Sequence, residues 1–150
     1  MEKGKYRKSM THKENKQSGD LYISWDEYNK KIEELAVQIN DELYGFEFNQ
    51  IVCIAKGGNS LAKTTPNLGN KVLLVDDLAD SGRTLEKCVE WLKHYEGFFI
   101  DDLRTATLWT KGLSTFTPDY YVEYLPNNPW IHQPFEKYEK MLVEELNREL

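Results

Sequence analysis

The sequence has few cysteines, no long apolar run and no excess of positive charge. Its 150 residues include 2 Cys and 5 Pro, and the formal net charge is −6. No run of about 18 apolar residues is present, so we expect no membrane-spanning helix. The acidic balance argues against nucleic-acid binding through a broad basic surface. The chain also starts without an apolar signal segment, which predicts a cytoplasmic protein with reduced cysteines.

The first part of the chain differs in composition from the rest. Residues 1–20 are polar and rich in lysine, and they contain almost no core-forming side chains. This composition predicts a disordered basic tail, followed by one domain over residues 21–150. A basic arm that contacts nucleic acid is the alternative.

Beyond the tail, helical patterns alternate with short apolar segments. Ser24 and Glu27 form the spacing of a capping box before the first helical pattern. The continuous apolar segments are typical of strands buried on both faces of a parallel sheet. Cys53 falls in such a strand and Cys88 in a predicted helix, and we expect both to be buried. We therefore expect an α/β fold, a parallel sheet flanked by helices, with ligands bound at the carboxyl ends of the strands. The expected helices cover 25–43, 84–95 and 135–150, the strands 50–55, 72–75, 103–109 and 120–124, and a loop 126–134.

Three carboxylates follow the apolar segment 72–75. Asp76 and Asp77 are adjacent there, and they could bracket a sugar diol or hold a hard metal ion. Asp80 begins a turn that leads into a helix, where backbone amides and the helix dipole favour a phosphate. The turn offers further amides and hydroxyls from Ser81, Gly82, Arg83 and Thr84. A helix cap with solvated acids is the plainer interpretation. The full pattern favours a ligand that is both sugar and phosphate.

Residues 72–85 resemble the phosphoribosyl pyrophosphate (PRPP) signature of type I phosphoribosyltransferases. The resemblance implies an α/β core and transfer of ribose 5-phosphate from PRPP to a nitrogenous base, with release of pyrophosphate and assistance from Mg²⁺. It also implies that Asp76 and Asp77 meet the ribose hydroxyls and the metal. The loop 80–84 would hold the 5-phosphate, and Asp80 would act as general acid or base.

A second segment resembles the pyrophosphate loop of the same family. The apolar run 51–55 continues into Lys56, Gly57 and Gly58, where the family has an arginine before the two glycines. Glycines allow backbone amides to approach a diphosphate closely. Lysine keeps the charge of arginine but loses its bidentate geometry.

Three later segments, 109–111, 119–123 and 130–136, are similar to xanthine-guanine phosphoribosyltransferases. By this resemblance Lys111 reads the 6-oxo group of a purine, and Trp130 with Ile131 covers and contacts the base. The plainer alternatives are a solvated charge for Lys111, a core-filling aromatic for Trp130 and a structural imidazole for His132. The resemblance implies PRPP and a purine base as partners and a homo-oligomer.

The sequence departs from the family between Gly58 and Asp76. Residues 59–75 are too few for the helix, strand and mobile loop that the family places there, so the fold is expected to be reduced by about one helix and one strand. The loss would expose apolar sheet surface unless another chain covers it. It would also shorten the loop that excludes water from the reacting centre. Two alternatives to the transferase therefore stay open. One, favoured by the short interval, is a degenerate PRPP- or nucleotide-binding module with a regulatory or vestigial role. The other is an interaction protein that uses the basic tail and the acidic C-terminal helix.

Overall fold

The computed structural model describes residues 19–41, 43–55, 60–61, 70–94, 100–139 and 141–149. The chain divides into two compact units, which we describe separately: Ser24–Asn128 is the larger, and the residues up to Ile23 together with those from Pro129 onward form the smaller. Within the described ranges, no helix is both long enough and apolar enough to cross a membrane. The expected tail, 1–20, lies outside the described residues except for its last two positions, so its disorder stays a prediction.

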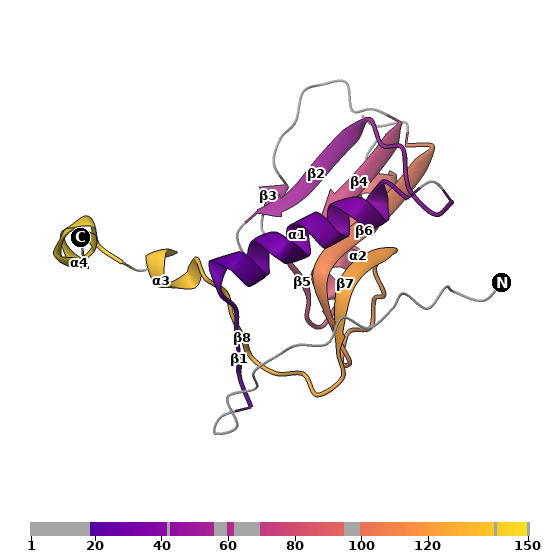
Figure 1. Ribbon diagram of the computed structural model, residues 1–150. Helices are drawn as coiled ribbons and strands as arrows, with labels where there is room; N and C mark the ends of the chain where they lie inside the picture. Colours follow the sequence, from indigo (N-terminus) through magenta and orange to yellow (C-terminus); the bar gives the residue numbers. More distant parts are fainter. Residues whose placement is uncertain are drawn as a thin grey trace. The chain divides into compact units, whose positions relative to one another are not determined.

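The larger unit is built on a mostly parallel sheet between two helices, α1 (Trp25–Ile39) and α2 (Arg83–His94) (Figure 1). Strands β2, β4 and β6 are neighbours, β3 lies beside β2, and both β5 and β7 pair with β6. Among the described strands, β3 alone runs antiparallel to its neighbour. The strands are β2 (Gln50–Ala55), β3 (Ser60–Leu61), β4 (Lys71–Val75), β5 (Leu78–Ala79), β6 (Asp102–Lys111) and β7 (Tyr120–Leu125). The expected α/β parallel sheet with flanking helices is confirmed.

Helix α1 starts as the sequence predicts but ends earlier. The capping box is formed, because the Ser24 side chain accepts from the Glu27 amide at 3.2 Å and Glu27 accepts from the Ser24 amide at 2.9 Å. The helix ends at Ile39 rather than near residue 43. The reason is Asp41, whose Oδ1 accepts from two following amides, at residues 43 and 44, and so stabilises a turn in place of a further helical turn.

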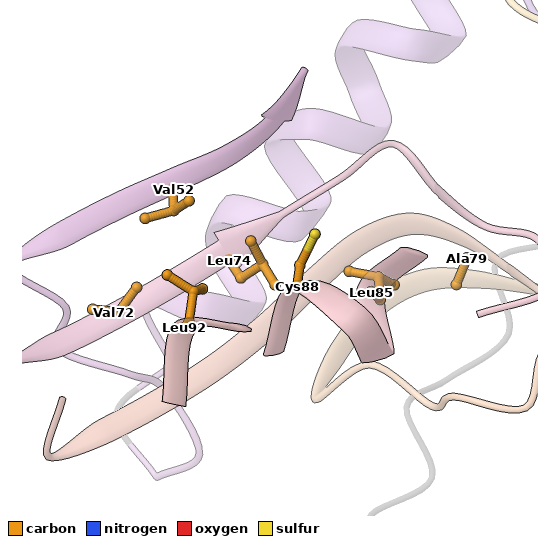
Figure 2. Packing of buried hydrophobic residues seen from close by; sticks show 7 residues of the cluster. All are labelled: Val52, Val72, Leu74, Ala79, Leu85, Cys88 and Leu92. Atoms are coloured by element: carbon orange, nitrogen blue, oxygen red, sulfur yellow. The ribbon is translucent and has the colours of Figure 1, made fainter. Parts of the chain in front are cut away.

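The face of the sheet that packs against α2 is closed and apolar. In Figure 2 the side chains of α2 point toward those of β2 and β4. Val72 and Leu74 of β4 are fully buried, and Val52 of β2 is nearly so. Their partners on the helix recur at spacings of three and four residues, which gives α2 one apolar stripe: Leu85, Cys88 and Leu92.

The opposite face is covered by α1 over β6 and β7 but is open at β2. Ile51 pairs with Leu73 in the parallel register, yet the Ile51 side chain is 43% exposed. Cys53 is also exposed, whereas Cys88 is buried. The expectation that strand 50–55 and its cysteine would be buried on both faces is therefore wrong for the single chain. The physical reason is the position of α1, which packs on the strands at the other side of the sheet.

The connection between β2 and β4 is short for a parallel pair. Of residues 59–75, the structure describes 60–61 and 70–75, and the described part before β4 forms only the two-residue strand β3. The strand β4 that follows pairs directly with β2. The described part of this interval contains no helix, and the loss of about one helix and one strand stays a prediction.

The smaller unit contains a two-stranded parallel sheet and two short helices. Strand β1 (Leu21–Tyr22) pairs with β8 (Ile131–His132), so the expected loop over 126–134 is wrong at these two residues. A segment without a strand pattern of its own can still form a two-residue strand when an extended neighbouring segment supplies the hydrogen-bond partners. The single charged helix expected over 135–150 is also wrong: the structure has α3 (Glu136–Glu139) and α4 (Val143–Glu149), and neither buries a side chain.

Candidate active site

The adjacent acids Asp76 and Asp77 interrupt a strand rather than end one. Val75 of β4 pairs with Ala106, and Leu78 of β5 pairs with Trp109, so both strands follow one register along β6. The acids remain attached to β6 through their backbone, because the Asp76 amide donates to the Ala106 carbonyl at 3.1 Å. The expectation that the strand ends before the acids is therefore corrected: β5 continues it beyond them.

The carboxyl groups of Asp76 and Asp77 interact with each other, and both residues are partly buried. The Asp77 amide donates to Asp76 Oδ1 at 3.0 Å. Burial and the neighbouring Asp77 charge raise the pKa of Asp76 to about 7. A cation can balance the charge of such a carboxyl pair, and hydroxyl groups can donate hydrogen bonds to it.

The acid pair is held by an irregular point in the ladder. Two successive amides of β6, those of Leu108 and Trp109, donate to the same Asp77 carbonyl at 3.0 and 3.1 Å. Strict alternation would place Ala106 and Trp109 on opposite faces of the sheet. Instead Ala106 packs with Ile39 of α1, and the Trp109 ring contacts Tyr28 of the same helix at 6.1 Å between centroids. The ladder is thus irregular at this point without an extra residue in either strand, and Trp109 faces α1.

The turn after the acids is fixed by the chain that follows β6. Gly82 has φ +79°, a backbone conformation that favours glycine. A Cβ at this position would also lie 2.6 Å from the Phe116 nitrogen and from Ser114 Oγ, so there is no space for a side chain. The Ser81 carbonyl accepts from the amide and the hydroxyl of Thr115, at 3.0 and 3.1 Å. Sequence reasoning missed this brace, and the small polar residues at 114 and 115 were its only signal.

Helix α2 begins directly behind this turn. Its first residue is Arg83, one position before the expected start, and the Glu86 amide donates to the Gly82 carbonyl at 3.0 Å. The exposed side chains of Ser81, Arg83 and Thr84 thus lie at the start of a helix of 12 residues. A helix start carries free amides and partial positive charge, which suit a phosphate.

Lys111, at the end of β6, is paired with the third acid. Its Nζ lies 3.1 Å from Asp80 Oδ1, and the lysine side chain is only 6% exposed, whereas that of Asp80 is 61% exposed. The interpretation of Lys111 as a solvated surface charge is therefore wrong. The pair places a positive donor and a negative acceptor side by side, next to the turn that begins α2.

Helix α1 places two further residues near the candidate site, Tyr28 and Lys31, which were not predicted from the sequence. Lys31 Nζ lies 2.7 Å from Glu123 Oε2, which also accepts from the Trp109 indole nitrogen at 3.1 Å. Tyr28 lies beside this group, and burial together with the charges of Asp77 and Asp76 raises the pKa of its phenol. The available signal was the i, i+3 spacing of Tyr28 and Lys31 on the apolar side of the helix.

The other expected site residues lie in the smaller unit or outside the described residues. Trp130 is 62% exposed, so it is not the core-filling aromatic of the plainer interpretation, and Ile131 is buried in β8. His132 is half-buried and held by neighbouring side chains, which fits a structural imidazole. Lys56, Gly57 and Gly58 lie outside the described residues.

The acid pair fits a magnesium ion in its chemistry. Both donors are carboxylate oxygens, which hard cations prefer. Burial and, after it, the neighbouring Asp77 charge raise the pKa of Asp76, and a bound cation would offset that charge. In the described part of the chain, no three His, Cys, Asp or Glu side chains gather as a metal site. Mg²⁺ commonly binds through one or two carboxylates, with substrate phosphates and water completing its coordination.

A comparison with models of protein families identifies the family to which the chain belongs. The model described as "Phosphoribosyl transferase domain" matches residues 63–140, which include the acid pair, the turn 80–84, Lys111 and Trp130. The chain belongs to this family. The matched range is more than half of the chain, and it begins after Lys56, Gly57 and Gly58.

Solved structures show the same phosphoribosyltransferase fold. A purine phosphoribosyltransferase from Pyrococcus horikoshii Ot3 matches with a TM-score of 0.61 and 23% identity, over 83% of this chain and 97% of that one. A xanthine-guanine-hypoxanthine phosphoribosyltransferase from Helicobacter pylori matches with a TM-score of 0.60 and 18% identity, over 85% and 97%. A search of curated proteins found no match.

Proposed function

We propose that this member of the phosphoribosyltransferase family transfers the 5-phosphoribosyl group of PRPP to a 6-oxopurine such as guanine, xanthine or hypoxanthine. The observation that carries the proposal is the contact between Lys111 and Asp80, 3.1 Å apart, beside the turn that begins α2. The family supports PRPP as the donor. The ion pair supports a base that offers both a carbonyl oxygen and a ring nitrogen that carries a proton.

The phosphoribosyl half of the substrate is assigned to the acids and the turn. Asp76 and Asp77 would accept from the ribose hydroxyls and hold Mg²⁺, which neutralises charge on the diphosphate when bound. Ser81, Gly82, Arg83 and Thr84 would hold the 5-phosphate through amides and hydroxyls. Lys56, Gly57 and Gly58 would bind the pyrophosphate group.

The base half follows from the chemistry of the ion pair. Lys111 would donate to the 6-oxo group, while Asp80 would accept from N7 of the same purine. Adenine presents the reverse pattern at these atoms, an amino donor and a nitrogen acceptor, and would be disfavoured. Trp130 and Ile131 are assigned to the face and edge of the base, where stacking contributes about 1–3 kcal/mol.

In the proposed reaction the purine N9 forms a bond to C1 of the ribose. The bond between C1 and the pyrophosphate oxygen breaks, and pyrophosphate leaves with the electron pair. The N7 proton passes to Asp80, which acts as general base.

Two measurements test the proposal together. Isothermal titration with PRPP and Mg²⁺ measures donor binding, and a pyrophosphate-release assay with guanine, hypoxanthine, xanthine and adenine measures turnover. We expect PRPP binding and release with the three 6-oxopurines, and little release with adenine. Absence of PRPP binding contradicts the proposal outright.

A second candidate is a PRPP- or nucleotide-binding module without turnover. The short interval 59–75, whose described part before β4 forms only β3, favours it, because less chain is available to cover the reacting centre. PRPP binding without pyrophosphate release from any base would establish this candidate instead.

A further inference from the structure

The segment that carries Trp130 and Ile131 is held in the smaller unit by a very short strand pair. Strands β1 and β8 have two residues each, with Leu21 opposite Ile131. The Leu21 amide donates to the Trp130 carbonyl at 2.7 Å, and the Ile23 amide donates to the carbonyl of residue 132 at 3.0 Å. An isolated two-stranded pair is marginally stable in water even when longer, so side chains must add to it.

His132 supplies contacts on three sides. Its ring stacks on Tyr22, the residue opposite it in the strand pair, with 4.3 Å between centroids and 11° between planes. Nε2 lies 3.1 Å from Asp20 Oδ2, and Nδ1 lies 3.8 Å from Glu136 Oε2. Because an ionised carboxylate only accepts hydrogen bonds, Nε2 carries the proton in the contact with Asp20.

These contacts join three pieces of chain at one side chain. Asp20 and Tyr22 belong to the segment before α1, and Glu136 begins α3, so His132 connects β8 to both. The backbone next to it carries Trp130, whose side chain is 62% exposed and can meet a ligand, while Ile131 is 5% exposed and anchors the strand. An exposed aromatic on an anchored strand is a preorganised contact, which loses little conformational entropy on binding.

We propose that His132 is a positioning residue for the base-contacting segment, and that it acts by holding β8 against β1 through Asp20 and Tyr22. This inference rests on the proposed function, in which Trp130 and Ile131 contact the purine. His132 itself touches no substrate in this scheme. Its loss weakens purine binding and leaves the binding of PRPP intact.

The first test measures the strand pair without any substrate. Hydrogen exchange is followed at the amides of Leu21 and Ile23 in the full chain and in His132→Leu. The matched control is His94→Leu, because His94 is an exposed histidine on α2. We expect roughly tenfold faster exchange in His132→Leu alone, the size of one lost hydrogen bond to a charged group. Unchanged exchange overturns the proposal.

The second test separates positioning from a general structural role. We expect the KM for guanine to rise roughly tenfold in His132→Leu, while kcat and the KM for PRPP stay within about twofold of the His94→Leu values. His132→Gln, which keeps a donor for Asp20, should recover part of the loss. Equal losses in both KM values, or an unchanged KM for guanine, overturn the proposal.

The outcomes keep this inference apart from the proposed function. If the wild-type chain neither binds PRPP nor releases pyrophosphate, the proposed function fails whatever the histidine variants do. If the wild-type chain turns over and His132→Leu behaves like His94→Leu, only the inference about His132 fails.

Discussion

The two faces of the sheet in the larger unit have different chemistry. Under α2 the contacts are apolar and the strand side chains, such as Leu74, are fully buried. Under α1 the helix contributes Tyr28 and Lys31, which meet Trp109 and Glu123, and the sheet is open at Ile51. The face under α1 also has an apolar cluster, in which Leu73 and Ala106 pack with Ile39, so the contrast lies in the charged and aromatic groups of β6 and β7 that α1 meets, which we call the polar face. We expect substitutions at the exposed turn beside α2 to change activity more than stability, and substitutions on the closed face to change stability.

The largest effect is expected at the ion pair beside α2. Asp80→Asn should lower kcat by roughly 100-fold or more, about 3 kcal/mol in the barrier, because the amide cannot take the purine proton. Stability should change less than activity, since the Asp80 side chain is 61% exposed and the amide oxygen of the variant can still accept from the Lys111 ammonium group. Pyrophosphate release and thermal unfolding measure the two quantities. Asp26→Asn, at an exposed acid on α1, is the control. A variant that unfolds at a much lower temperature would contradict this expectation.

The next largest effect is expected on the closed face, in stability. Leu74→Ala should lower the free energy of unfolding by about 3 kcal/mol, because it removes buried contacts and leaves a cavity. Ile51→Ala, on the open face, should cost less than about 1 kcal/mol, since that side chain is 43% exposed. Denaturant unfolding of both variants measures the difference. Equal losses would show that the open face is covered in solution, as a self-associating chain would do.

The closed face could be predicted from the sequence, and much of the polar face could not. The apolar run 72–75 and the helical spacing of Leu85, Cys88 and Leu92 depend on local periodicity alone. The acid pair and the glycine turn were visible because their residues are contiguous. Lys31 and Glu123 form an ion pair although they are 92 positions apart in the sequence, and a local sequence pattern does not predict such a contact.

The register of strands also limited the prediction. The ladder is irregular at Leu108 and Trp109 because their two amides share the Asp77 carbonyl as acceptor. No pattern of side chains in the sequence predicts this backbone arrangement. The strand at Ile131 exists because β1 lies beside it, and two residues are too few for a periodic signal.

A medium effect is expected where α1 meets the polar face. Lys31→Met should lower the free energy of unfolding by about 2 kcal/mol, because Glu123 then keeps a mostly buried charge without the lysine that lies 2.7 Å away. Adding Glu123→Leu to this variant should recover much of the loss, since the unbalanced charge disappears. Denaturant unfolding of the two single variants and the double variant gives the coupling energy. Additive losses would mean that the ion pair does not stabilise the contact of α1 with β7.

The smallest effect is expected from the acid pair, and its sign depends on pH. The pKa of Asp76 is about 7 in the folded chain, above the ordinary aspartate value of 3.8, so the folded state keeps a proton that the unfolded state releases. Below both values there is no penalty. As pH rises from about 4 to 7 the unfolded state is increasingly favoured, so stability is lost, and above 7 the full penalty remains.

Asp76→Asn removes that penalty because the amide stays neutral at every pH. We expect Asp76→Asn to be more stable than the wild type at pH 8 by on the order of 1 kcal/mol, after allowance for solvent screening. At pH 4 the two should unfold alike. Thermal unfolding in a chelator measures this, and Mg²⁺ at pH 8 should then stabilise the wild type more than the variant, because only the wild type has both carboxylates. A wild type that gains stability between pH 5 and 8 would show that the charges of Asp76 and Asp77 are already balanced within the chain, and the polar face would then need no cation.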